Sequence, residues 1–211
     1  MSFMFNGYSS LEKLDCTNFN TNNVINMSHM FSECSSLQYL NLNNFNTCKT
    51  NYMNCMFYGC SSLKGLNISN FDTSNVQKMN GMFSGCSSLT ELNLNNFNTN
   101  NVYNMSGMFF KCSSLTELNL NNFNTNHVID MSYMFMGCSS LDEINVNNFN
   151  TNTVLSMKRM FSDCCSLKRL DLSNLDTTNV IYMKFMFYKC PYKLQMKIKS
   201  QYKNIMEEAF E

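Results

Sequence analysis

Seven cysteines recur at intervals of 26 residues, and this period constrains the possible folds more than any other feature of the chain. Each cysteine lies in the same sequence pattern, which is clearest at Met108–Thr125 and in the Val-x-x-Met-x-x-Met-Phe segment that follows. A fixed period of about 20 to 50 residues is typical of a solenoid, in which each repeat buries its apolar face only by stacking on its neighbours. The column consists of Cys34, Cys60, Cys86, Cys112, Cys138, Cys164 and Cys190.

The apolar residues of the repeat fall in columns with the same period. Sixteen of the nineteen methionines lie in two columns that begin at Met1 and Met4, and a phenylalanine column directly follows the second. Because equivalent side chains of successive coils lie one above the other, we predict Met, Phe and Leu ladders that form one continuous core. A methionine stripe could also bind a soft metal, but thioethers fill irregular gaps equally well, so we favour the core.

Each repeat combines two hydrophobic spacings. Leu118 and Leu120 alternate with polar residues as in a short strand, and one such strand per coil predicts a parallel sheet. The segment from Val128 to Phe135 has the spacing of one helical face, with Gly137 as a candidate C-cap. The sequence therefore predicts an α/β solenoid of about seven coils, each with one parallel strand and one short helix. Its Leu-x-x-Leu-x-Leu-x-x-Phe pattern resembles a leucine-rich repeat, which implies a leucine-rich-repeat solenoid. A second strand in place of the helix, giving an all-β solenoid, is the alternative.

The two ends of the chain differ from the repeats. Residues 1–190 are assigned to the solenoid, which begins in the middle of a repeat, so we expect either upstream repeats or end-to-end self-association between open ends. The remaining residues, 191–211, are predicted to form a C-terminal cap of a strand plus a helix. The strand is indicated because Leu194, Met196 and Ile198 alternate with polar residues, and a helical apolar face follows it.

The repeat is similar to that of the BspA-like surface-protein family, a kind of leucine-rich repeat. The similarity rests on the Met-Phe-x-Gly-Cys-Ser-Ser-Leu pattern of Met82–Leu89, on Asn95–Thr99 and on Val102–Ser106, and it is renewed in every unit up to about residue 190. The resemblance implies a parallel solenoid displayed at the cell surface or secreted, with a role in adhesion or host interaction. The chain departs from the family because we find no export signal or anchor, so a cytoplasmic location stays open.

Composition and charge argue against two classes of protein. No apolar run approaches the roughly 18 residues that a membrane helix needs, so no transmembrane segment is expected. The net charge is zero and no basic stripe follows the repeats, so we expect no nucleic-acid partner. Residues 1–157 hold five Lys/Arg against nine Asp/Glu, whereas residues 158–211 hold ten against six, so the two parts differ in the sign of their charge.

The eleven cysteines allow three interpretations. Coils about 4.8 Å apart would bring equivalent cysteines near disulfide distance, but parallel side chains in a ladder seldom have disulfide geometry. Zinc is disfavoured because the period supplies no Cys-x-x-Cys pair. We therefore predict a column of buried, reduced thiols, no metal site and no cofactor.

No residues of the repeat indicate catalysis. His29 and His127 occupy different positions in different repeats and have no fixed serine or cysteine partner. The seven glycines form no phosphate-binding loop. We expect a non-enzymatic protein, with a hydrolase as a remote alternative.

The outward positions of the predicted strands form the candidate binding face. One column is asparagine with aspartate at both ends, and a variable column lies beside it. Solenoids use such extended faces to bind partners, so we expect a protein or glycan ligand. The asparagines could instead bond to one another along the stack, and the protein could be an intracellular structural scaffold without a ligand. The predicted face consists of Lys13, Tyr39, Asn41, Asn67, Glu91, Asn93, Glu117, Asn119, Glu143, Asn145 and Arg169.

Overall fold

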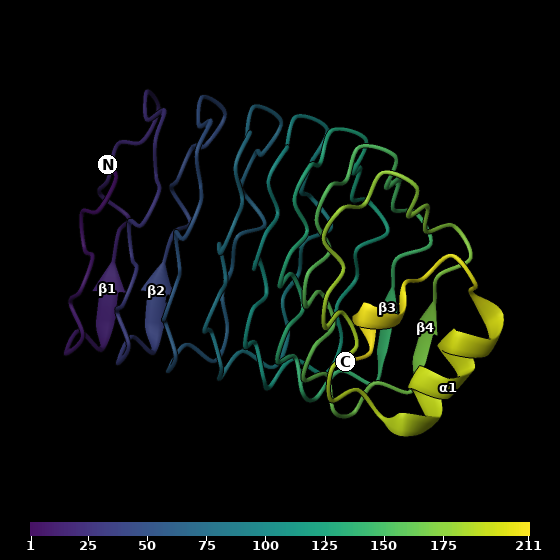
Figure 1. Ribbon diagram of the computed structural model, residues 1–211. Coiled ribbons are helices and arrows are strands. Elements are labelled where there is room, and N and C mark those ends of the chain that lie inside the picture. The colour runs from purple at the N-terminus through teal and green to yellow at the C-terminus, as the bar shows by residue number, and fades with distance from the viewer.

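The chain forms a curved stack of coils, shown by a computed structural model that describes residues 1–211 (Figure 1). Six parallel bridges link equivalent residues of seven successive coils, which confirms the predicted repeat solenoid. No helix has both the length and the apolar character needed to span a bilayer. The bridged residues are Asn26, Tyr52, Lys78, Asn104, Asp130, Ser156 and Tyr182.

Regular strands form only at the two ends of the array. β1 (Lys13–Asp15) pairs in parallel with β2 (Tyr39–Asn41), and β3 (Glu143–Asn145) pairs in parallel with β4 (Arg169–Asp171). No backbone hydrogen bond joins the equivalent residues of the three coils between these pairs. The prediction of one strand in every coil is therefore wrong for the middle of the array.

The short helix predicted in each coil does not form. Between Val128 and Phe135 the structure has one bridge residue and a series of turns. Tyr133 lies in the left-handed region at a φ of 62°, and so does Gly137 at 77°. Two left-handed residues recur in each coil at these positions, and they exclude an α-helix, which needs right-handed dihedral angles throughout. The all-β alternative, with a second parallel ladder, describes the structure better.

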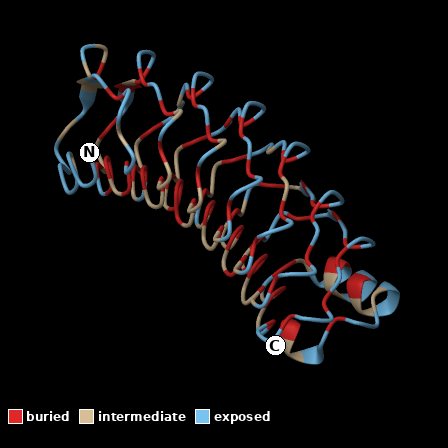
Figure 2. Cartoon of the chain, turned by 90° about the horizontal axis from the view of Figure 1, so that it is seen from above, coloured by how far each residue is buried: buried red, intermediate tan, exposed pale blue.

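Backbone hydrogen bonds between coils hold these turn segments together. The N–H of Phe109 donates to the carbonyl of Met134, and the N–H of Phe135 donates to that of Met160, both at 2.9 Å. Local bonds alternate with them, as from Met134 N–H to the Met131 carbonyl at 3.2 Å. We call this the Met–Phe ladder. It joins every pair of neighbouring coils, and Figure 2 shows that the coils lie closer together on one side of the curve than on the other.

The core consists of stacked, identical side chains, as predicted. From Phe31 to Phe187, phenylalanine rings of successive coils lie parallel with centroids 5.6–5.8 Å apart. Both methionine columns are fully buried from Met27 to Met186. One apolar cluster of 60 buried residues thus runs through the whole array, which explains why no coil could fold alone.

The cysteine column is buried and its thiols are free, as predicted. Each column thiol donates a hydrogen bond to the carbonyl of the phenylalanine 29 residues earlier, as from Cys112 Sγ to Phe83 O at 3.0 Å. The same carbonyl also accepts the N–H of the residue three positions after it, as from Cys86 N–H to Phe83 O at 3.1 Å, so the thiol of the next coil occupies its second acceptor position. The thiol therefore has a structural role in every repeat.

The C-terminal segment has a different secondary structure from the predicted one. α1 (Tyr192–Gln201) occupies the stretch predicted as a strand, and the 3-10 helix η1 (Glu207–Ala209) follows. Leu194 and Ile198 are buried, whereas Met196 between them is 47% exposed. Two apolar residues four apart lie on one face of a helix, so the alternating pattern concealed a helical face.

This segment lies against the last coil (Figure 1). The carbonyl of Glu208 accepts the N–H of Phe185 at 2.8 Å, and the ring of Phe210 stacks on Phe187 with centroids 5.2 Å apart. These contacts extend the Met–Phe ladder and the phenylalanine stack by one further layer. At the other end of the stack, Phe3 is 56% exposed.

Thiol labelling of the native protein should sort the cysteines by burial. We expect Cys165, which is exposed, to react first, and the half-buried Cys48 and Cys55 to react more slowly. The eight buried thiols should react only after unfolding, because labelling requires access and a thiolate. Mass spectrometry of timed maleimide reactions measures this, with fully denatured protein as the control. Fast labelling of Cys112 in the native state would contradict the structure.

The buried thiols should also make the protein less stable in alkali. Burial raises the pKa of Cys86 and of Cys138 to about 12, whereas a thiol in the unfolded chain titrates near 8.5. The folded state therefore retains these protons, and the resulting stabilisation is complete below about pH 8.5 and is lost as the pH rises toward 12. Each buried thiol should lower the free energy of unfolding by up to about 1.4 kcal/mol per pH unit in this window.

Urea unfolding between about pH 8 and pH 10 measures this slope. Cys138→Ala should flatten it by about one proton, even though the variant is less stable at every pH. An exposed-site control, Cys165→Ala, should leave the slope unchanged. Equal slopes for Cys138→Ala and the parent would show that the thiol is not protected by folding.

Candidate functional site

The strand face contains all of the predicted binding residues. In β3 and β4 the central residue is buried and its two neighbours are exposed, so alternate side chains project from the stack. Of the eleven predicted residues, ten are exposed and Asn41 is half-buried. The array therefore brings them together on one surface, and their part in binding stays a prediction.

The middle of this face is hollowed into a groove of about 710 Å³. The groove lies over the coils that have no strand, where Gly65 contributes no side chain and Tyr39, 53% exposed, stands at one end. Glu91 and Glu117 line its other part. The N–H and carbonyl of Leu66 have no hydrogen-bond partner in the chain. The groove thus presents unpaired backbone groups together with aromatic and charged side chains.

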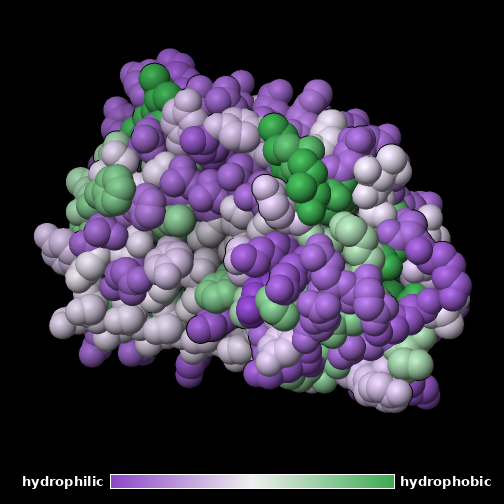
Figure 3. All heavy atoms as spheres, viewed as in Figure 1, coloured by the Kyte–Doolittle hydropathy of each residue, from purple (hydrophilic) through white to green (hydrophobic).

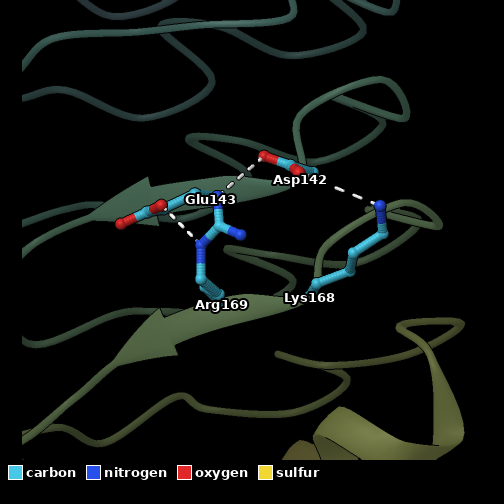
Figure 4. Close-up of polar contacts among 4 residues, drawn as sticks. All are labelled: Asp142, Glu143, Lys168 and Arg169. Carbon is cyan, nitrogen blue, oxygen red and sulfur yellow. Dashed lines mark hydrogen bonds and ion pairs between the residues drawn. The ribbon is translucent and has the colours of Figure 1, made fainter.

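The glutamates of this face differ in their pairing. Arg169 Nε donates to Glu143 Oε2 at 2.6 Å, and its guanidinium lies 3.4 Å from Asp142 Oδ1 (Figure 4). The hydrogen bond to Glu143 raises the pKa of Arg169. Glu91 and Glu117 form no salt bridge. The two glutamates of the predicted face that have no basic partner therefore both line the groove.

The asparagine column of the face serves mainly the fold. Asn93 Oδ1 accepts the N–H of Asn95 at 3.0 Å, and the other four asparagines of the column make the same turn. Asn119 Nδ2 also donates to Asn95 Oδ1 at 3.0 Å, which supports the alternative that these amides bond along the stack. The side-chain amides of Asn41 and Asn93 donate to no group of the chain and are free for a ligand.

A second asparagine column, which the sequence analysis did not single out, joins neighbouring coils. Asn122 Nδ2 donates to the carbonyl of Leu94 at 2.9 Å and to that of Phe97 at 2.6 Å, and the asparagines one coil away do the same. The sequence holds a signal for this role. The position is asparagine in every repeat from Asn18 to Asn174, whereas the outward column changes to aspartate at both ends.

The two histidines take part in no catalytic arrangement. The ring of His29 stacks on Phe3 with centroids 4.6 Å apart, and His127 lies exposed in another coil. No group of three His, Cys, Asp or Glu side chains is placed to hold a metal ion.

Comparison with known proteins gives a family match and several similar folds. The family described as "Mycoplasma protein of unknown function, DUF285" matches residues 1–90, 40–118 and 111–209. No curated protein matches the chain. Three similar solved structures are leucine-rich-repeat proteins. That of T. pallidum is 19% identical, with 99% of this chain and 78% of the other covered at a TM-score of 0.40.

The second solved structure, from Bacteroides ovatus, is 14% identical, with 100% of this chain and 85% of the other covered at a TM-score of 0.26. The third is described as a leucine rich cell surface protein from Faecalibacterium prausnitzii. It is 16% identical, with 74% of this chain and 69% of the other covered at a TM-score of 0.24.

The two asparagine columns should respond differently to one substitution. Asn122→Asp removes the donor to two carbonyls and places a carboxylate beside them, so it should lower the free energy of unfolding by about 1–3 kcal/mol. Asn93→Asp keeps the oxygen that accepts the N–H of Asn95 and loses no donated bond, so its cost should stay within about 0.5 kcal/mol. Urea unfolding of both variants measures the difference. Equal costs would contradict the assignment of the second column to coil stacking.

Proposed function

We propose that this chain, which belongs to the DUF285 family of Mycoplasma proteins of unknown function, is a non-enzymatic binding module. Its ligand is a protein or a glycan, which binds in the groove of the strand face. The observation that carries the proposal is the groove itself, which coincides with coils whose backbone is unpaired on this side. A core of stacked ladders needs no such opening. The groove is lined by tyrosine, glutamate and free side-chain amides, and surfaces of this kind recognise ligands.

The groove favours a ligand with basic groups and an extended shape. Neither Glu91 nor Glu117 forms a salt bridge with a basic side chain of the protein. A cationic ligand group would therefore bind both carboxylates without breaking an existing ion pair. The free backbone groups of Leu66 could pair with an extended segment, as in recognition by strand addition. Tyr39 adds a large contact surface at low entropic cost.

The location and assembly of the protein are part of the same proposal. Display at a cell surface, with a role in adhesion or host contact, is supported by the resemblance of the repeat sequence to the BspA-like family. The rival function is an intracellular scaffold without a specific ligand. Residues 191–211 act as a cap on the solenoid of residues 1–190 under this proposal. End-to-end association would then join two open N-terminal coils, because Phe185 N–H at the other end is already bonded.

Neutralising the two free glutamates of the groove should abolish binding without unfolding the protein. The test is to screen the parent against glycan and peptide arrays and then to compare Glu91→Gln/Glu117→Gln on every ligand found. Both side chains are exposed, so the free energy of unfolding should change by no more than about 0.5 kcal/mol. Affinity should fall at least about tenfold if two charge-assisted contacts are lost.

Two further variants make the result interpretable. Glu33→Gln removes an exposed glutamate from the Met–Phe side and should bind like the parent. Met108→Ala should cost about 2–5 kcal/mol through a core cavity and impair binding only by unfolding. A double variant that binds every ligand like the parent would remove the groove from the proposal, and a parent that binds no ligand would favour the scaffold.

A further inference from the structure

A row of exposed apolar side chains follows the second parallel ladder and lines none of the described grooves. Figure 3 shows an elongated hydrophobic band on one face of the molecule, bordered by hydrophilic side chains. Tyr103, Ile129, Leu155 and Ile181 occupy one position of the repeat in four successive coils and are 36%, 45%, 42% and 61% exposed. We call these four residues the apolar stripe.

The backbone fixes the apolar stripe in a straight row. The N–H of Ile129 donates to the carbonyl of Tyr103 at 2.9 Å, and the same bond joins Leu155 to Ile129 at 2.9 Å and Ile181 to Leu155 at 2.8 Å. Parallel strands bonded in this way lie about 4.8 Å apart, so the side chains stand side by side. The residue before each member of the row is a buried valine, such as Val128. The core is therefore complete without the stripe, and folding does not require its apolar character.

Basic side chains accompany the apolar stripe. Lys78 Nζ lies 5.7 Å from the ring centroid of Tyr103, at the start of the row. Lys158 and Lys184 each follow a stripe residue by three positions, and Asp130 is the one acidic residue next to a member of the row. Ile181 lies in residues 158–211, which hold ten basic and six acidic residues, whereas the other three members lie in residues 1–157, which hold five basic and nine acidic residues. The charges within three positions of the row, or in contact with it, are three lysines and one aspartate, and this local excess of basic groups favours an anionic partner.

We propose that the apolar stripe docks the protein on a lipid bilayer with anionic headgroups. A single row of four side chains is too small for a stable protein interface, which buries about 1,200–2,000 Å². A bilayer interface needs no shape complementarity, because it admits aliphatic side chains while lysines contact the headgroups. Tyr103 begins the row and Tyr182, 61% exposed, adjoins its last member, and tyrosine is enriched at this depth of the membrane. The proposal is independent of the groove.

The test is sedimentation of the full chain with large unilamellar vesicles. Phosphatidylcholine vesicles serve as the neutral surface, and mixed phosphatidylcholine and phosphatidylserine vesicles serve as the anionic one. The parent should bind the anionic vesicles more tightly, and added salt should weaken this binding. Ile129→Ser/Leu155→Ser/Ile181→Ser should lower the partition coefficient at least about tenfold. Lys158→Gln/Lys184→Gln should lower it about tenfold on the anionic vesicles only.

The repeat supplies a matched control for single substitutions. Ile25 occupies the same position and is 58% exposed, but Asn51 and Gln77 separate it from the apolar stripe. Ile25→Ser should bind vesicles like the parent, whereas Leu155→Ser should bind several-fold more weakly. Thermal unfolding should show that all of these variants remain folded, because the substituted residues are exposed.

Three outcomes would overturn the proposal. The parent could fail to bind anionic vesicles, or the triple variant could bind them like the parent. Sedimentation velocity could also show a dimeric parent and a monomeric triple variant, in which case the apolar stripe is a contact between two copies of the chain. If Glu91→Gln/Glu117→Gln no longer binds the ligands found on the glycan and peptide arrays, vesicle binding and sedimentation velocity should not change. The two proposals can therefore be contradicted independently.

Discussion

The Met–Phe ladder is the interaction on which the rest of the structure depends. Its backbone bonds join every coil to the next, as from Phe109 to Met134 and from Phe135 to Met160, and they continue directly into the second parallel ladder. It sets the close spacing at which phenylalanine rings stack and methionines fill the layer between coils. Because the spacing is fixed on this side, the other side can open, and the groove of the strand face is the result.

Side-chain hydrogen bonds join neighbouring coils where a continuous sheet is absent. Column cysteines donate a second hydrogen bond to phenylalanine carbonyls, and Asn122 and its equivalents donate to the carbonyls of the turn in the preceding coil. Buried threonines add a third column, in which Thr99 Oγ1 donates to Asn124 O at 2.8 Å and accepts the N–H of Asn124 at 2.8 Å. A stack rich in asparagine, threonine and cysteine is therefore stabilised by groups that a hydrophobic pattern does not reveal.

The sequence predicts the parts of this fold that depend on period and burial. Columns of identical residues require equivalent environments, so the stacked core and the buried thiols follow directly from the spacing of Met, Phe and Cys. The helix was wrong because the spacing of Val128, Met131 and Phe135 also suits a path of turns, and the left-handed φ at Tyr133 has no single residue type as its signal. Of the candidate site, the outward residues were predictable and the groove was not. A groove arises from missing pairing between coils, and Gly65 was its only local trace.

The hydrogen bonds of the last coil also bear on aggregation. A stack of near-identical coils resembles a short piece of a fibre, since each layer is a template for one more, and open edges of β structure recruit further chains. In this protein the donor edge at Phe185 and Phe187 is occupied by the carbonyls of Glu208 and Ala209, which belong to a segment of different sequence and shape. A nonrepeating segment of chain therefore occupies the donor groups that a further repeat would use.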